Sequence, residues 1–165
     1  MRNYTILFII LNILISCSGD KKINKDVDCP KSFISMEHRN YYSMNKDSSD
    51  ILNYRASINN IKAKCSLINE QSISTILEIL FVIKPDNLEN NTYDFSYFVS
   101  ILNNEEIVDY QLFQTKGEFK LDDNGFPKET NVIESLDQFF PSQTESYEIL
   151  LGFVLTKEKY DLIQD

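Results

Sequence analysis

The sequence predicts an all-β protein built as a single antiparallel β-sandwich. Beyond residue 28, apolar side chains recur at every second position, which is the repeat of a strand that buries one face. Polar loops separate these runs at short intervals, and no long segment has the 3.6-residue repeat of a helix. The part of the chain after residue 16, about 149 residues long, suits one domain with a sizeable core.

Two weaker strands begin the predicted domain. The first spans residues 31–42 and the second spans residues 53–67. Within the second strand the apolar positions change parity at Asn59 and Asn60. This predicts a β-bulge, because one extra residue shifts the alternation of the side chains.

The next two strands, 72–84 and 93–102, have the clearest alternation. Their predicted inner faces carry Ile73, Thr75, Leu77, Ile79, Phe81 and Ile83 in the first and Tyr93, Phe95, Tyr97, Val99 and Ile101 in the second. Residues 103–106 form a hairpin-sized loop. The strand after this loop, 107–113, is predicted to turn Val108, Tyr110 and Leu112 inward, which indicates a meander.

Residues 130–140 and 147–155 complete a set of seven strands, and the last is apolar on both faces, as a central strand is. Gly152 within it predicts a bulge or a close approach of another segment. Seven strands joined by polar loops favour a sandwich of the immunoglobulin or fibronectin type III kind. Thr156 suits the N-cap of a short C-terminal helix containing Tyr160 and Ile163.

The first residues have the pattern of a secretory signal. Arg2 precedes an apolar run over residues 4–15, shorter than the roughly 20 residues that a spanning helix needs. The run ends in Leu14, Ile15, Ser16 and Cys17, and this LISC segment resembles the lipobox of bacterial lipoproteins. The alternative is a signal anchor with a buried cysteine.

The resemblance implies a defined processing of the chain. A diacylglyceryl group joins the sulfur of Cys17, cleavage falls between Ser16 and Cys17, and the new amino terminus is acylated, typically with palmitate. Residues 1–16 are then a signal peptide, 17–28 a lipidated tether and 29–165 the sandwich domain. Two or more acyl chains hold a protein stably on a membrane, so the membrane is an expected partner.

The tether follows Cys17 directly. In lipoproteins of bacteria with two membranes, Asp after the lipidated cysteine marks retention in the inner membrane. Ser18 stands at that place, which favours the periplasmic face of the outer membrane. Residues 18–28 carry six charges and two isolated aliphatic side chains, so we expect a flexible linker.

Export predicts a disulfide between Cys29 and Cys65, because oxidising compartments preserve cysteine pairs. Cys29 precedes the first predicted strand and Cys65 lies late in the second. Antiparallel pairing of those two strands is expected to bring the cysteines together.

Charge excludes one class of function. Without residues 1–16 the chain carries 15 Lys and Arg against 25 Asp and Glu. Binding to phosphate backbones or to anionic lipid surfaces draws on clustered basic residues. Nucleic acid is therefore not an expected partner.

The sequence offers no catalytic, metal or cofactor site. His38 is the only histidine, and no nucleophile elbow or glycine-rich phosphate loop occurs. The run Asp122–Gly125 lacks the later acidic ligand of a calcium loop, and its Asn-Gly pair is a turn signal. Glu105 and Glu106 are adjacent, so on a strand they point to opposite faces. We therefore do not expect an enzyme.

A second resemblance covers most of the mature chain. The pair Cys29-Pro30, Cys65, the segment 97–102 and the segment 152–161 are similar to a group of small lipoproteins of two-membrane bacteria. Because no reaction is known for that group, the resemblance implies no catalytic residues.

These observations favour a periplasm-facing module that binds or assembles another envelope protein. Tyr41, Tyr42 and Tyr54 are the predicted partner surface, because tyrosine is favoured at interfaces. Their alternative role is a cross-strand aromatic pair that holds the first two strands. The rival function is a small-solute-binding protein or enzyme with a tyrosine and acidic pocket, and an enclosed polar cavity would favour it.

The lipobox generates a direct prediction. The Cys17→Ala chain should remain a full-length precursor that takes up no labelled fatty acid, because the acceptor sulfur is gone. Metabolic labelling with a fatty acid measures the lipid uptake, and electrophoresis of the same sample measures the length of the chain. Undiminished lipid labelling of this variant would show that Cys17 is not the lipidation site.

Overall fold

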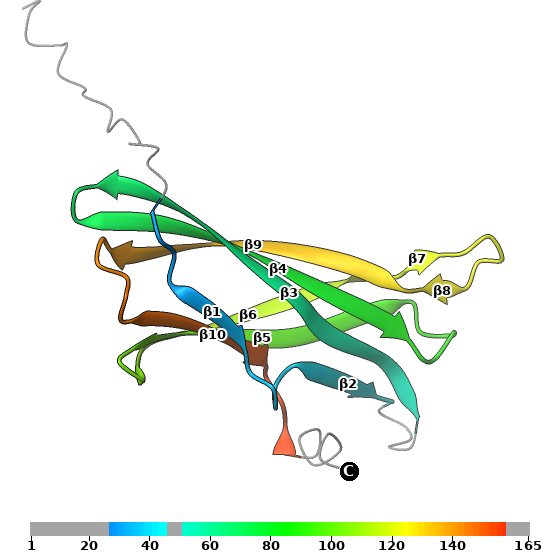
Figure 1. Ribbon diagram of the computed structural model, residues 1–165. Helices are drawn as coiled ribbons and strands as arrows, with labels where there is room; N and C mark the ends of the chain where they lie inside the picture. Colours follow the sequence, from blue (N-terminus) through cyan, green and yellow to red (C-terminus); the bar gives the residue numbers. More distant parts are fainter. Residues whose placement is uncertain (1–26, 46–50, 158–165) are drawn as a thin grey trace, which may run out of the picture.

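The computed structural model describes residues 27–45 and 51–157 (Figure 1). The predicted signal peptide with Ser16, the lipidation site Cys17, most of the tether, and Tyr160 and Ile163 of the predicted C-terminal helix lie outside these residues. In the described part of the chain, no helix has the length and apolarity that crossing a membrane requires.

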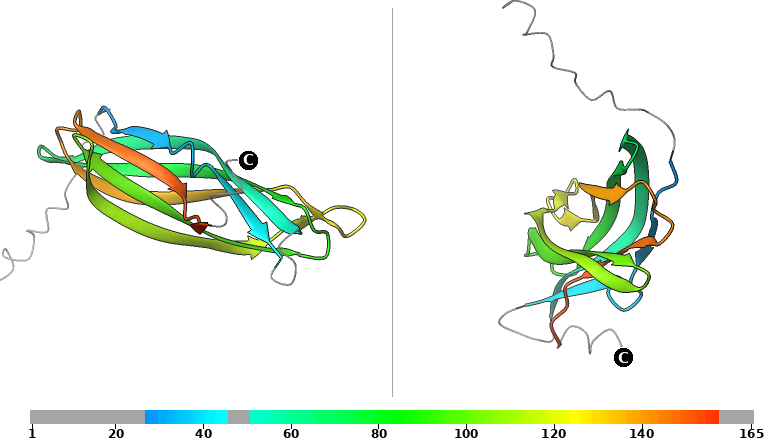
Figure 2. Two further views of the ribbon diagram at one scale, coloured as in Figure 1. Left: turned by 90° about the horizontal axis from the view of Figure 1, so that it is seen from below. Right: turned by 90° about the vertical axis from the view of Figure 1, so that its left-hand side faces the viewer.

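The domain is an all-β sandwich of two four-stranded sheets (Figure 2). Sheet A has the order β2-β3-β4-β9 and consists of Asn40–Met44, Leu52–Asn69, Ser72–Pro85 and Thr130–Pro141. Sheet B has the order β1-β10-β5-β6 and consists of Lys31–Ile34, Tyr147–Phe153, Thr92–Asn103 and Glu106–Glu118. A small hairpin, β7 (Lys120–Leu121) and β8 (Pro127–Lys128), lies between β6 and β9 in the chain.

The inner faces of the long strands meet as the alternation predicts. Every predicted inner residue of β4 and β5 is buried, including Thr75. The ring of Phe81 on β4 lies 5.1 Å from that of Phe95, 5.0 Å from that of Tyr97 and 5.8 Å from that of Phe153. Because Phe81 belongs to sheet A and the other three rings belong to sheet B, this aromatic cluster joins the two layers.

The predicted bulge in the second strand is confirmed. The pairing register between β3 and β4 shifts between Ile58 and Asn60. Before the shift the even-numbered residues up to Ile58 point into the core. After it the odd-numbered residues do so, and Ile61, Ala63, Cys65 and Leu67 pack against the core.

The predicted first strand, 31–42, is two strands in different sheets. β1 pairs with β10 and β2 pairs with β3, so the chain crosses from sheet B to sheet A at residues 35–39. Two backbone hydrogen bonds hold the crossing. The amide of Phe153 donates to the carbonyl of His38 at 2.7 Å, and the amide of Ile58 donates to the carbonyl of Arg39 at 3.0 Å. The β1–β10 pair is parallel, so the sandwich is not wholly antiparallel.

Gly152 permits this crossing. A Cβ atom there would lie 2.5 Å from the Cβ of His38 and 2.8 Å from the ring of Phe98. The close approach that the sequence predicts at Gly152 is therefore confirmed, and its partner is the crossover segment. Nδ1 of His38 also lies 2.9 Å from the carbonyl oxygen of Phe153, which gives the only histidine a structural role.

The strand order is not the one expected. β3 and β4 are neighbours in one sheet, and β5 and β6 are neighbours in the other. In the immunoglobulin arrangement the second and third strands belong to different sheets. The coarse prediction of a β-sandwich is confirmed, whereas the immunoglobulin or fibronectin type III order is not.

The strand over residues 107–113 lies in β6, but its predicted inner face is wrong. Gln111, Phe113 and Thr115 face Val99, Tyr97 and Phe95 in the register, so they lie on the inner side of the sheet. Val108, Tyr110 and Leu112 are exposed. The reason is that β5 fixes the register across the turn of Asn104 and Glu105, whose φ angles are 50° and 70°, and a bulge at Ile101 and Leu102 adds one residue to β6.

The predicted disulfide is present, although not for the predicted reason. Cys29 and Cys65 are bonded, with their Cα atoms 5.5 Å apart. Cys29 leads into β1 of sheet B and Cys65 lies on β3 of sheet A, and these strands do not pair. The bond therefore ties the start of the domain across the two layers.

The hydroxyl of Tyr54 forms a second tie between the layers. It donates to the carbonyl of Asp94 and accepts from the amide of Asp94, whose nitrogen lies 2.9 Å away. β10 pairs with β5 only as far as Tyr97. At Asp94, therefore, no strand lies on that side of β5 to bond its peptide groups. A side chain of sheet A thus replaces the missing strand of sheet B.

Removing this hydroxyl should weaken the sandwich. The Tyr54→Phe chain leaves both peptide groups of Asp94 without their partner, and we expect a loss of about 1.5 kcal/mol in the free energy of unfolding. Tyr110→Phe removes an exposed hydroxyl and should change it by less than about 0.5 kcal/mol. Urea unfolding measures both, and equal losses would contradict the role given to Tyr54.

Candidate functional site

The three tyrosines of the predicted partner surface do not form one. Tyr41 and Tyr54 are only 8% and 3% exposed and belong to the core, so the prediction is wrong for both. Their rings stack 6.1 Å apart across β2 and β3, which is the alternative aromatic pair. Tyr42 has the opposite parity and is half-buried on the outer side of sheet A. The error follows from the crossover, which places β2 over the core.

Burial changes the acidity of the inner tyrosines. Loss of hydration raises the pKa of the Tyr54 phenol well above its ordinary range, although the bond to the Asp94 backbone opposes the shift. Burial, followed by the nearby Glu134 carboxylate, raises the pKa of Tyr97 in the same direction. These phenols therefore stay neutral and structural at physiological pH.

Open hollows lie on the surface of the described residues. One, about 580 Å³, is lined by Val27, Asp28 and residues 142–146, and a second, about 470 Å³, lies beside the β3–β4 turn. A third, about 200 Å³, lies over sheet A around Tyr42 and Arg55. None of these three hollows is lined by both tyrosine and acidic side chains, which is the pocket that the rival function needs.

The acidic residues singled out in the sequence serve turns. The carboxylate of Asp122 accepts from the amides of Asn124 at 2.9 Å and Phe126 at 2.8 Å, and Gly125 has a φ of 83°. This is the turn that Asn-Gly predicts. Across residues 27–45 and 51–157, no group of three His, Cys, Asp or Glu side chains is placed to hold a metal ion.

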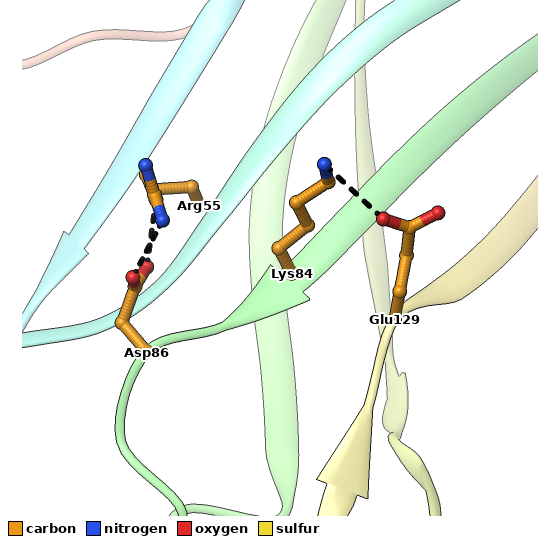
Figure 3. Close-up of polar contacts among 4 residues, drawn as sticks. All are labelled: Arg55, Lys84, Asp86 and Glu129. Atoms are coloured by element: carbon orange, nitrogen blue, oxygen red, sulfur yellow. Dashed lines mark hydrogen bonds and ion pairs between the residues drawn. The ribbon is translucent and has the colours of Figure 1, made fainter.

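The outer side of sheet A carries ion-paired charges beside the exposed apolar side chains Ile76, Ile133 and Phe139. Arg55 donates through Nε and Nη2 to the carboxylate of Asp86 at 2.9 and 2.8 Å, and Nζ of Lys84 lies 3.2 Å from the carboxylate of Glu129. Figure 3 shows these two pairs side by side. Further along the sheet, Lys64 lies 2.7 Å from Glu78. Exposed pairs of this kind add little stability, but they keep a sheet face solvated.

The outer side of sheet B is different, because most of its central positions are apolar. We define the apolar face of sheet B as the outward side chains Phe33, Phe98, Leu102, Ile107, Tyr110, Leu112 and Leu150. Ile107 and Leu112 are 64% and 62% exposed. The face therefore presents large apolar side chains to solvent.

The register shows why these residues are contiguous. Phe33, Leu150, Ser100 and Tyr110 form one row across the four strands. Gly152, Phe98 and Leu112 form the next row, and the rings of Phe98 and Tyr110 stack 5.6 Å apart between the rows. Val108, at the bulge, adds a further exposed side chain beside this face.

Side chains close the edge of the sandwich next to this face. The amides of Gln111 on β6 and Gln138 on β9 bond to each other at 3.4 and 3.1 Å. The hydroxyl of Thr115 donates to the carboxylate of Glu134 at 3.0 Å. These bonds occupy the inner polar residues of β6 and leave its outer apolar residues facing solvent.

Sequence reasoning missed this face because it assigned Val108, Tyr110 and Leu112 to the core. One signal was available. Ile107 and Val108 are adjacent and both apolar, which breaks the alternation and is what a bulged edge strand shows.

No protein-family model, curated protein or solved structure matches this chain.

The buried phenols predict a loss of stability in alkali. In the unfolded chain a tyrosine ionises near pH 10, whereas in the folded chain Tyr54 and Tyr97 ionise only at higher pH. Their contribution is complete below about pH 10 and is lost as the pH rises further. Urea unfolding at about pH 8 and pH 11 should show a smaller loss for Tyr97→Phe than for the unchanged chain. Equal losses would contradict the burial of an ionisable phenol at this position.

Proposed function

We propose that this chain is a lipid-anchored, periplasm-facing lipoprotein whose sandwich docks another envelope protein through the apolar face of sheet B. The exposure of that face is the observation that carries the docking role. The LISC segment at Leu14 to Cys17 and Ser18 after it support the anchor and the outer membrane as its place.

The area of the face suits an interaction site. Four strands at about 4.8 Å spacing and two to three rows at about 7 Å give roughly 300 Å². Contiguous apolar patches of that order on a soluble domain are often functional. Burying one is worth several kcal/mol at about 25 cal/mol per Å² before the costs of association.

The contrast between the two sheets supports the same assignment. The pairs Arg55–Asp86, Lys84–Glu129 and Lys64–Glu78 lie on the outer side of sheet A, and none of the ion pairs among the described residues lies on the outer side of sheet B. If exposed apolar side chains were only a consequence of composition, we would expect both sides to carry them in a similar setting. On sheet A the exposed apolar side chains are interrupted by charged ones, since Ile76 lies between Lys64 and Asp137 in the register, although Ile133 faces Leu80 at the edge. On sheet B they adjoin one another in neighbouring rows.

The proposed tether would keep this face near the membrane. Cys29 is fixed by its disulfide, and Phe33 on β1 begins the apolar face four residues later. A flexible linker of the length of residues 18–28 spans about 20 Å. The docked partner would then lie close to the membrane surface that holds Cys17.

Photo-crosslinking in intact cells tests the docking role. A photoreactive side chain at Leu112 should give a discrete product that contains a second, different envelope protein, and the product should weaken in the Cys17→Ala chain. Ile133 is the matched control, because it is 68% exposed on an edge strand of the other sheet.

Two results would contradict the proposal. Equal products from Leu112 and Ile133 would mean that the apolar face has no special role. No product from Leu112 in a chain that is exported and disulfide-bonded would mean that the face is not covered by a partner.

A further inference from the structure

The least protected edge of the sandwich is β6. The other edge of sheet B, β1, has four residues, and β2 at one edge of sheet A has five. β9 at the last edge has twelve residues, with Glu134, Asp137 and Pro141 among them. β6 has thirteen residues, and its segment 107–113 contains one charge, Asp109, and no proline or glycine. Edge strands are normally shortened or charged, because their free peptide groups pair with other strands.

We propose that β6 pairs antiparallel with β6 of a second copy of this chain, centred on Gln111. The two sheets B would then form one eight-stranded sheet related by a two-fold axis. A two-fold contact uses the same surface of both copies, so the strand must be complementary to itself.

The charges of β6 meet this condition in the proposed register. Tyr110 of each copy lies opposite Leu112 of the other. Because the bulge at Val108 adds a residue, Lys116 of each copy comes alongside Glu105 and Glu106 at the turn of the other. All three side chains are exposed, and none of the ion pairs among the described residues involves them. Two sets of opposite charges therefore close the two ends of the pairing.

Two neighbouring registers fit less well. A shift of the centre by one residue toward the C-terminus, to Leu112, brings Glu118 of each copy alongside Glu105 and Glu106 of the other, so like charges meet at both ends. A register centred between Gln111 and Leu112 would place the outward side chains of one copy opposite the inward side chains of the other. The two apolar faces would then lie on opposite sides of the joined sheet. The edge strand β9 has only acidic charges, so pairing it with itself brings like charges together.

The carboxylate of Asp109 protects the edge in the single chain. It accepts from the backbone amide of Tyr110 at 2.9 Å and from the side-chain amide of Gln111 at 2.7 Å. Pairing has to displace that carboxylate, so we infer a reversible contact between copies. The pairing would also join the two apolar faces, because Tyr110 and Leu112 belong to them, and would double the width offered to a partner.

Cysteine crosslinking of the full chain in membranes tests the pairing. Chains carrying Tyr110→Cys and Leu112→Cys, distinguished by tags and expressed together, should form a disulfide-linked heterodimer, because these positions face each other. Each variant expressed alone should give less disulfide-linked dimer. Chains carrying Ile133→Cys should give the background yield of such dimers. A mixed yield no higher than the Ile133→Cys background would overturn the proposal.

Charge reversal supplies an independent readout. Lys116→Glu should reduce the mixed crosslink about tenfold, as two repulsive ends replace two attractive ones. Adding Glu105→Lys and Glu106→Lys to the same chain should restore it. Failure of the restoration, in chains that keep the native disulfide, would reject the register.

The outcome is separable from that of the proposed function. A photo-crosslink from Leu112 that contains only this chain supports the pairing and opposes a different partner. A product that contains another protein, with background cysteine crosslinking, does the reverse.

Discussion

The structure depends on the packing of aromatic rings between the two sheets. Phe81 of sheet A lies against Phe95, Tyr97 and Phe153 of sheet B, so the inner faces of both sheets are satisfied only by each other. Once the inner faces are fixed, the alternation of the strands fixes every outer face as well. The apolar face of sheet B is thus set by the core, although none of its side chains belongs to the core.

Ties between the layers keep this arrangement in one register. The disulfide of Cys29 and Cys65 and the bonds of the Tyr54 hydroxyl to Asp94 both join sheet A to sheet B. The crossover at His38 passes close to Gly152, so the first strands are divided between the two sheets. A rigid frame of this kind suits a binding module, because little order has to be gained when a partner docks.

The sequence predicts the parts of the fold that depend on local alternation. The inner faces of β4 and β5, the bulge at Asn59 and Asn60 and the close approach at Gly152 all follow from nearby residues. The split of the first strand and the burial of Tyr41 and Tyr54 do not, because they depend on contacts with β10 and β5, far along the chain. The face of β6 was misassigned for a similar reason. As an edge strand it turns Gln111 and Thr115 inward to meet β9, and only the register with β5 reveals this.

If the apolar face of sheet B docks a partner, it is covered in the cell while the outer side of sheet A is not. Thiol labelling of a Leu112→Cys chain in intact cells tests this most directly, with the same cells in urea as the full-labelling reference and an Ile133→Cys chain as the control. We expect Leu112→Cys to be labelled several-fold more slowly in cells than Ile133→Cys, and the two to be labelled alike in urea. Equal labelling of both chains in intact cells would contradict it.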